Sequence, residues 1–307
     1  MTTIQAPFGS MITAMITPMN PDGTVDYDGA ARLAEYLVID MRNDGLVLNG
    51  TTGEAPTTTD AEKEQLLRVV LDAVGDRAKV VAGVGTNVTA HTIELARAAE
   101  RAGVHGLLVV TPYYSKPPQA ALEAHFTSVA DSTGLPMLIY DIPGRTGAAV
   151  ATQTLVRLAA HPRIIGVKDA KDNPGATSHV LAQTDLVYYC GTDMLNLPWL
   201  ALGAVGFISV VGHVVGDRLR EMIDEFGAGD VTRARQIHYE LVPVYDGMFR
   251  NQGAVMTKAA LDLLGQPGGA VRAPLLAATG SERHQLTLDL TAGGVKLPGT
   301  DLRGTSA

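Results

Sequence analysis

The sequence predicts an α/β protein, a (β/α)8 TIM barrel followed by a C-terminal helical extension. Three observations support this: eight short apolar runs recur between residues 11 and 210, a polar loop follows each run, and a segment with helical spacing follows each loop. This alternation is typical of parallel strands joined by crossover helices. Eight units fit a closed barrel better than an open doubly wound sheet, which usually has fewer strands and a glycine-rich phosphate turn after the first.

The strands are expected at the apolar runs, in the following order: Met11–Thr17, Gly45–Asn49, Lys79–Gly83, Gly106–Thr111, Met137–Asp141, Ile164–Lys168, Val187–Cys190 and Val205–Val210. The crossover helices are expected between and after them: Asp26–Met41, Thr59–Val74, Thr89–Ala102, Gln119–Asp131, Thr152–Ala160, Pro174–Gln183, Asp193–Leu202 and Asp217–Phe226. Thr59 and Glu62 have the spacing of a capping box, which indicates a helix start. Gly75 and Gly103 stand where helices should end.

A boundary is expected near residue 230, between a barrel domain of residues 1–230 and an extension of residues 231–307. Helical spacing in the extension covers Val231–Met248 and Ala254–Leu264, and a Gly/Pro-rich stretch follows. Residues 299–307 are mostly small and polar and have little to bury, so we expect a mobile tail.

The composition restricts the class of protein. The chain has 307 residues, of which 46% are hydrophobic, so it can bury a sizeable core. Its formal charge is −8 and it has no run of Lys or Arg, which argues against nucleic acid and anionic membranes as partners. The longest apolar window, residues 199–211, is too short and too interrupted by glycine to span a bilayer. Its one cysteine, Cys190, excludes an internal disulfide, and the first residues lack a signal-peptide pattern, so we expect a cytoplasmic protein.

Lys168 is the first candidate for catalysis, because it ends the apolar run Ile164–Lys168. Burial disfavours an ammonium, and the resulting free amine can attack a ketone to form a Schiff base. The plain alternative is a strand-end lysine that reaches solvent or pairs with Asp169. Residues at the other strand ends must decide between these interpretations.

Metal chemistry has no support in the sequence. The eight histidines form no pair with metal-ligand spacing and no cluster with cysteine, which argues against a metal-dependent aldolase. Cys190 ends a Tyr-Tyr-Cys strand without a nucleophile motif, and we interpret it as a buried structural thiol. We therefore expect no metal and no cofactor.

Further polar groups follow other strands, where barrel enzymes place their sites. The turn Gly50–Glu54 offers backbone N–H groups and hydroxyls suited to a carboxylate, although it could be an ordinary turn. Tyr140 could shuttle protons beside a Schiff base, or simply fill the core. Arg145 has donors suited to bidentate carboxylate binding, or could be a solvated loop residue. Tyr114 follows the fourth strand.

Four segments together resemble the dihydrodipicolinate synthase/N-acetylneuraminate lyase superfamily, and within it most closely the dihydrodipicolinate synthase branch of actinobacteria. They are Gly50-Thr51-Thr52-Gly53-Glu54, Thr111-Pro112-Tyr113-Tyr114, Tyr140-Asp141-Ile142-Pro143-Gly144-Arg145-Thr146-Gly147 and Gly166-Val167-Lys168-Asp169-Ala170. The resemblance covers about residues 8–265. It implies a class I aldolase-type condensation of pyruvate with L-aspartate-4-semialdehyde to 4-hydroxy-tetrahydrodipicolinate, in diaminopimelate and lysine biosynthesis.

The resemblance also implies a role for each site residue. Lys168 would form the Schiff base with pyruvate. Thr51, Tyr114 and Tyr140 would form a proton relay, with Tyr114 entering the site of a neighbouring subunit. The remaining positions would bind substrate: Thr52 the pyruvate carboxylate, Arg145 the semialdehyde carboxylate, and Ile208 and Gly191 the pocket wall through their backbones. A homotetramer built from tight dimers is the assembly it implies.

Two alternatives stay open. Thr51 and Arg145 follow the synthase pattern rather than that of the neuraminate lyases, but a related pyruvate-dependent aldolase acting on a sugar acid or hydroxy-oxoglutarate needs only modest pocket changes. The other alternative is a non-catalytic barrel in which Lys168 pairs with a carboxylate ligand.

Regulation is suggested by three further residues. In lysine-inhibited members of the family, His and Glu side chains form an effector pocket between subunits. This sequence has Asp60, Lys63 and His91 at those places, and Lys63 would repel the ammonium of lysine. We therefore expect weak or absent inhibition by lysine.

Overall fold

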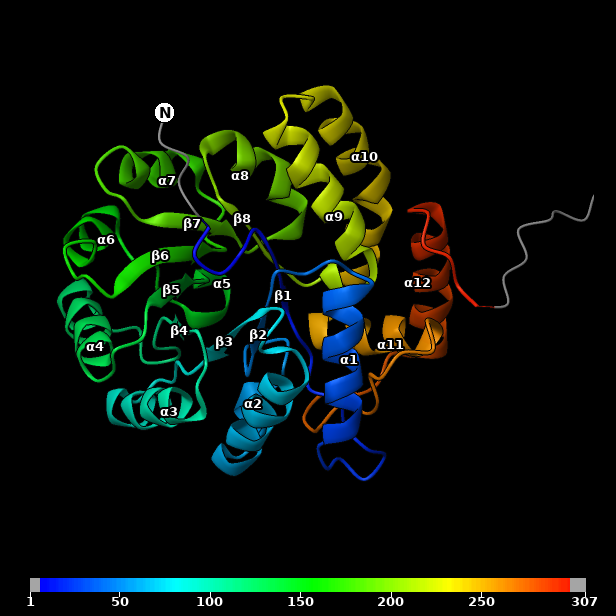
Figure 1. Cartoon of the computed structure of the whole chain (residues 1–307), viewed down its shortest axis with the longest axis horizontal. Helices are drawn as coiled ribbons and strands as arrows, with labels where there is room; N and C mark the ends of the chain where they lie inside the picture. Colours follow the sequence, from blue (N-terminus) through cyan, green and yellow to red (C-terminus); the bar gives the residue numbers. More distant parts are fainter. Residues whose placement is uncertain (1–5, 299–307) are drawn as a thin grey trace, which may run out of the picture.

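Eight parallel strands form a closed barrel at the centre of the molecule, ringed by helices (Figure 1). The computed structural model describes residues 6–298. Its strands are β1 (Met11–Ala14), β2 (Gly45–Leu48), β3 (Lys79–Gly83), β4 (Gly106–Val110), β5 (Met137–Asp141), β6 (Ile164–Asp169), β7 (Val187–Cys190) and β8 (Gly206–Ser209). Each pairs with the next, and β1 pairs with β8 to close the barrel. The predicted (β/α)8 barrel is confirmed.

Helices follow the strands in the predicted order. The outer helices are α1 (Tyr27–Ile39), α2 (Asp60–Val74), α3 (Thr89–Ala102), α4 (Gln119–Asp131), α6 (Thr152–Leu158), α7 (Pro174–Leu181), α8 (Asn196–Leu202) and α9 (Gly212–Gly227). The predicted capping box starts α2, since the Thr59 hydroxyl accepts from the Glu62 backbone and the Glu62 carboxylate accepts from the Thr59 backbone. Gly75 and Gly103 cap α2 and α3, and Gly103 has a φ of 88° that suits glycine.

Several boundaries differ from the prediction. The first strand ends at Ala14 rather than Thr17, because the backbone N–H of Ile16 donates to Nε2 of His213 instead of to a neighbouring strand. The helix predicted from Asp217 begins at Gly212, with a non-helical Val215 marking a kink. These ends depend on tertiary partners that the local pattern does not contain.

Two short helices at strand ends were not predicted: the 3-10 turn η1 (Ala55–Thr57) after β2 and α5 (Pro143–Thr146) after β5. A third, the 3-10 turn η2 (Asp193–Leu195), forms the start of the helix predicted over Asp193–Leu202. All three lie in the loops that follow strands, so they shape the end of the barrel where a site is expected.

Within residues 231–298, the C-terminal extension has three helices: α10 (Val231–Met248), α11 (Gly253–Leu263) and α12 (Gly280–Ala292). They group on one side of the barrel, where α10 packs on α9 and α12 packs on α10 (Figure 1). Helix α12 lies in the Gly/Pro-rich stretch after Leu264, where no individual helix was predicted. A capping box of Thr279 with Glu282 starts this helix. The predicted mobile tail, residues 299–307, lies outside the described residues.

Buried apolar side chains form two layers. The larger fills the space between the strands and the helices. The smaller fills the barrel interior and includes Ile12, Leu138, Tyr140, Tyr189 and Ile208. Among residues 6–298, no helix is long and apolar enough to cross a membrane. The interior layer ends at the carboxyl ends of the strands, and the candidate site begins there.

Candidate active site

Lys168 and Tyr140 lie side by side at the carboxyl ends of β6 and β5. They are direct partners in the register of these strands, so both side chains project from the same face of the sheet. Lys168 is 4% exposed and Tyr140 is 6% exposed. Nζ of Lys168 lies 4.3 Å from the centre of the Tyr140 ring. The buried amine therefore rests against an aromatic face, beside a phenol.

The surroundings of Lys168 favour its neutral form. Burial lowers the pKa of the amine from its ordinary 10.5 to about 8, against the opposing effects of Asp193 and Cys190, and Arg145 lowers it further. Burial also raises the pKa of Tyr140 to about 12, against the effects of Arg145 and of a hydrogen bond with Thr51. At neutral pH the site thus holds a protonated phenol beside an amine that readily loses its proton.

A cavity of about 510 Å³ opens in front of Lys168. Its lining includes Thr51, Thr52, Tyr140, Arg145 and Gly191, so five of the predicted site residues share one cavity with the lysine. Thr52 is buried, whereas Arg145 is exposed in the short helix α5.

Gly191 makes room for the lysine. A Cβ atom built on it would lie 3.0 Å from Cε of Lys168 and 2.9 Å from the carbonyl oxygen of Asp169. Any other residue at this position would push the amine or the strand out of place. The sequence prediction that Gly191 borders the pocket thus has a steric reason.

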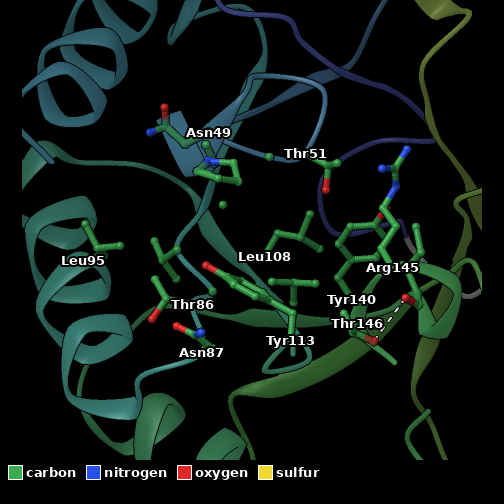
Figure 2. A pocket seen from close by; sticks show the side chains of 18 of the residues that line it. Asn49, Thr51, Thr86, Asn87, Leu95, Leu108, Tyr113, Tyr140, Arg145 and Thr146 are labelled. Carbon is green, nitrogen blue, oxygen red and sulfur yellow. Dashed lines mark hydrogen bonds between the residues drawn. The ribbon is translucent and has the colours of Figure 1, made fainter. Parts of the chain in front are cut away.

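Figure 2 shows Thr51, Tyr140 and Arg145 together on one side of a second, larger cavity, of about 830 Å³. Thr86, Asn87 and Leu95 lie on its opposite side (Figure 2). Because Thr51, Tyr140 and Arg145 border both cavities, they separate the lysine from the second space.

Tyr114 lies apart from the lysine within this chain. It lines the larger cavity but not the one in front of Lys168, and it is 90% exposed. Its φ of 73° is in the left-handed region, which is rarely populated by large residues. Ile208 is predicted to border the pocket through its backbone carbonyl; its side chain is buried in the barrel interior, and Val210, two residues further on, lines the cavity.

Two buried aspartates stabilise the carboxyl ends of β5 and β6. Asp141 follows Tyr140 and its carboxylate lies 3.1 Å from Nζ of Lys171. Asp169 follows Lys168 and accepts from the hydroxyl of Thr177 at 2.7 Å. These contacts hold the ends of the two strands in register, and they fix the directions of the tyrosine and the lysine that precede them.

Asp193 is a site residue that the sequence prediction missed. It is fully buried, lines the cavity with Lys168 and accepts from the Ser209 hydroxyl and from the backbone N–H groups of Val210 and Val211 at 2.9 and 3.1 Å. Burial raises the pKa of its carboxyl group, and these hydrogen bonds oppose that rise. An aspartate two residues after the Tyr-Tyr-Cys-Gly strand end was the available signal.

The C-terminal extension also reaches this cavity. Tyr245 and Phe249 from the α10 end and Gly253 and Ala254 from the start of α11 line it opposite the strand ends. The hydroxyl of Tyr245 is buried and has no hydrogen-bond partner within residues 6–298. Periodicity could place these residues on helices but could not show which barrel loop they face.

Asp60, Lys63 and His91 all line the larger cavity, where the effector pocket was expected. Nε2 of His91 lies 2.8 Å from Oδ2 of Asp60, and Nζ of Lys63 lies 3.9 Å from Oδ1 of the same carboxylate. The Lys63 amine also donates to the carbonyl of Thr58. The one carboxylate of this group is therefore already engaged by two basic side chains.

A TIM barrel with a buried, readily deprotonated amine beside a tyrosine at its mouth has the features of a Schiff-base-forming lyase. Comparison with known proteins agrees with this class. Residues 7–293 match the model of the dihydrodipicolinate synthetase family, and the chain belongs to that family.

The chain is 61% identical over 295 residues to 4-hydroxy-tetrahydrodipicolinate synthase 2 of the actinobacterium Streptomyces coelicolor, covering 96% of this chain and 98% of that one. Among solved structures, it is similar to the Cyanidioschyzon merolae enzyme with lysine bound (TM-score 0.93, 38% identity, 95% of this chain and 100% of that chain). It is also similar to the Acinetobacter baumannii enzyme complexed with pyruvate (TM-score 0.90, 32% identity, 95% and 100%).

Sequence identity of 61% over 96% of the chain supports assignment of the same activity. The chain has 4-hydroxy-tetrahydrodipicolinate synthase activity, that of a class I aldolase-type lyase in lysine and diaminopimelate biosynthesis. The predicted family, branch and reaction are therefore confirmed.

Proposed function

We propose that Lys168 forms a Schiff base with pyruvate as the first step of this reaction. The observation that carries the proposal is the buried amine facing Tyr140 in a cavity lined by Thr51 and Thr52. Nζ attacks C2 of pyruvate to give a carbinolamine, which loses water to become an iminium ion. Loss of a proton from C3 then gives the enamine, the carbon nucleophile of the next step.

Proton transfer in these steps is assigned to Tyr140, Thr51 and Tyr114. The Tyr140 phenol lies against the reacting amine, and its hydrogen bond to Thr51 provides an exit for the proton. Thr52 and its neighbouring backbone would hold the pyruvate carboxylate, since Thr52 lines the cavity and is buried. Gly191 and Ile208 are assigned to the pocket wall through their backbones.

The second substrate is L-aspartate-4-semialdehyde, and Arg145 would receive its carboxylate. Arg145 borders the lysine cavity yet is exposed, so it can meet a substrate that enters after pyruvate is bound. C3 of the enamine attacks the aldehyde carbon. The amino group of the condensed product then displaces Lys168 from the imine carbon, which closes the ring and restores the free amine.

A homotetramer of tight dimers is the assembly we propose, with Tyr114 completing the site of the neighbouring subunit. Its large exposed ring and left-handed backbone support this role, because a partner surface would cover the ring and compensate the strained conformation. We also propose residues 1–230 as the catalytic barrel and 231–307 as its extension, in a cytoplasmic protein whose one cysteine stays reduced.

Weak or absent inhibition by lysine is the regulation we propose. Lys63 and His91 already contact the Asp60 carboxylate, so the ammonium groups of lysine would meet the Lys63 cation and a carboxylate that already has partners.

Trapping with borohydride tests the proposed function. The protein is incubated with pyruvate, reduced, digested and analysed by peptide mass spectrometry, and the adduct should be found on Lys168, while a Lys168→Arg control should show none. An unmodified Lys168 would favour a carboxylate-binding barrel. If the adduct forms, a higher kcat/KM for a sugar aldehyde or glyoxylate than for aspartate semialdehyde would favour the related aldolases.

A further inference from the structure

Glu54 closes the threonine turn of the site and is itself buried. Its backbone N–H donates to the carbonyl of Thr51 at 3.1 Å, and its φ is 56°, a left-handed conformation that needs support in a residue with a long side chain. The carbonyl of Gly53 accepts from the hydroxyl of Thr17 at 2.7 Å. The positions of Thr51 and Thr52 therefore depend on how Glu54 is held.

Lys258 of helix α11 holds the carboxylate of Glu54. Its Nζ lies 2.6 Å from Oε1 of Glu54, and the two side chains are 2% and 1% exposed. The same Nζ donates to the carbonyl of Ala270, and the backbone N–H of Arg272 donates to Oε2 of Glu54 at 2.9 Å. Both carboxylate oxygens of Glu54 thus have partners within the protein, and the Lys258 amine has two acceptors there.

The side chain of Arg272 fastens the same C-terminal segment to the region around the turn. Its guanidinium donates to both carboxylate oxygens of Glu62, at 2.8 and 3.0 Å, and to the carbonyls of Gly23 and Thr57. The hydrogen bond with Arg272 is the largest of the effects that lower the pKa of Glu62 to about 2. The C-terminal extension therefore binds both the threonine turn, through Glu54, and the start of α2, through Glu62.

Helix α11 reaches the site at two points. Gly253 and Ala254 at its start line the cavity in front of Lys168, and Lys258, one turn further on, bonds to the turn that carries Thr51 and Thr52. One helix thus contacts both the cavity in front of Lys168 and the turn that carries Thr51 and Thr52. The position of α11 therefore affects the distance between this turn and Lys168.

We propose that the buried Glu54–Lys258 ion pair is a positioning device, through which the C-terminal extension fixes the pyruvate-binding threonine turn against Lys168. A buried ion pair gives little net stability compared with apolar residues of similar volume, and in some proteins such pairs instead fix register or orientation. Glu54 and Lys258 are positioning residues in this role, because neither lines the cavity in front of Lys168. The inference rests on the proposed roles of Lys168 and Thr52.

The test removes both charges together, in the double variant Glu54→Gln, Lys258→Met, so that no unpaired charge is left buried. The matched control is Asp262→Asn, Arg283→Met, which breaks an ion pair between the same helix α11 and α12, away from the turn. The thermal midpoint, the KM of each substrate and the rate of borohydride trapping at Lys168 are measured for both variants and for the wild type.

The expected result is a rise in KM for pyruvate and a fall in trapping rate of about tenfold or more, with a thermal midpoint close to that of the control. KM for aspartate semialdehyde should change by less than about twofold, because Arg145 lies on the β5 side of the cavity. A role confined to stability would lower the midpoint and leave both KM values unchanged. Wild-type values for pyruvate in a folded double variant would overturn the inference.

A second variant covers failure of the first to fold. Glu54→Asp keeps the charge and withdraws the carboxylate from Lys258 by one methylene, so the same difference between the two KM values is expected, and its absence would equally overturn the inference. Trapping in the wild type separates the two proposals. If the wild type forms no adduct at Lys168, the proposed function is refuted. If the Glu54→Gln, Lys258→Met and Glu54→Asp variants form the adduct at the wild-type rate, only the positioning role is refuted.

Discussion

The pH dependence of Schiff-base formation tests the central feature of the site, the lowered pKa of Lys168. Only the neutral amine attacks pyruvate, so the rate of adduct formation should rise with pH and level off above the pKa of the amine. Burial places that pKa at about 8 instead of the ordinary 10.5. The midpoint of the rise is therefore expected near pH 8.

The difference between these two pKa values sets the size of the effect. At pH 7, roughly 10% of an amine with a pKa of about 8 is neutral, against roughly 0.03% of one with a pKa of 10.5. The site thus increases the reactive form about 300-fold, which corresponds to about 3 kcal/mol. The apolar surroundings at the end of β6 supply this gain, against the opposing field of Asp193.

The assay is a rapid-quench experiment. The enzyme is mixed with subsaturating pyruvate between pH 5.5 and 10, quenched with borohydride, and the adduct is counted by intact mass. The variant Asp193→Asn adds a directional test: removing an anion that favours the ammonium should move the midpoint to lower pH. Because this carboxylate also accepts hydrogen bonds from Ser209 and two backbone N–H groups, the fold of the variant is checked by circular dichroism.

A rate of adduct formation that still rises steeply at pH 10 in the wild type, as an ordinary lysine would show, would refute the argument from burial. A shift of the midpoint to higher pH in a folded Asp193→Asn variant would refute the assigned electrostatics of the pair.

Four further predictions follow from the site. Arg145→Ala should lower kcat/KM for aspartate semialdehyde about 10- to 100-fold and leave the pyruvate adduct unchanged, because its partner is the second substrate; unchanged steady-state kinetics would remove Arg145 from the site. Thr51→Val keeps the side-chain volume and removes the hydroxyl that is hydrogen-bonded to Tyr140, so kcat should fall about 10- to 100-fold. The pH midpoint of adduct formation at Lys168 should stay at its wild-type value. An unchanged kcat would exclude Thr51 from the relay. Lys168→Met should raise the free energy of unfolding at pH 7 by about 1–3 kcal/mol, since the folded wild type buries a charge there. Between about pH 8 and 10.5 the unfolded chain binds more protons at Lys168 than the folded chain, so the free energy of unfolding of the wild type rises with pH. The stability difference between Lys168→Met and the wild type should therefore shrink over this range. Denaturant titrations of both proteins at several pH values check the sign. Sub-millimolar lysine should leave turnover unchanged because Lys63 repels its ammonium, and strong inhibition in a steady-state assay would contradict that reasoning.

The sequence by itself determined the barrel and most of the polar groups at its mouth. Strand-length apolar runs can be buried only if they pair, and their alternation with helical segments allows few arrangements. Lys168, Tyr140 and Thr51 were predictable because each lies within three residues of the end of such a strand, and parallel strands bring their carboxyl ends to one edge. The family motifs added the reaction.

Side-chain partners distant in sequence were decided only by the tertiary structure. Glu54 and Lys258 are 204 residues apart along the chain, and nothing in either local pattern indicates their ion pair. A lysine inside the apolar segment Ala254–Leu264 signals a buried partner but does not identify it. Asp193 likewise became a site residue only when β7 and β8 met, because its carboxylate accepts hydrogen bonds from the residues after β8.

The same physical distinction explains both outcomes. Periodicity and strand ends report which side of an element is buried, because burial of apolar area acts on each residue locally. Which charge faces which other charge depends on loop closure and on the packing of the C-terminal helices over the barrel mouth, and these follow from the whole fold. The lowered pKa of Lys168 combines both: its strand position and its neighbour Tyr140 were visible in the sequence, and the enclosure of the cavity by the start of α11 was not.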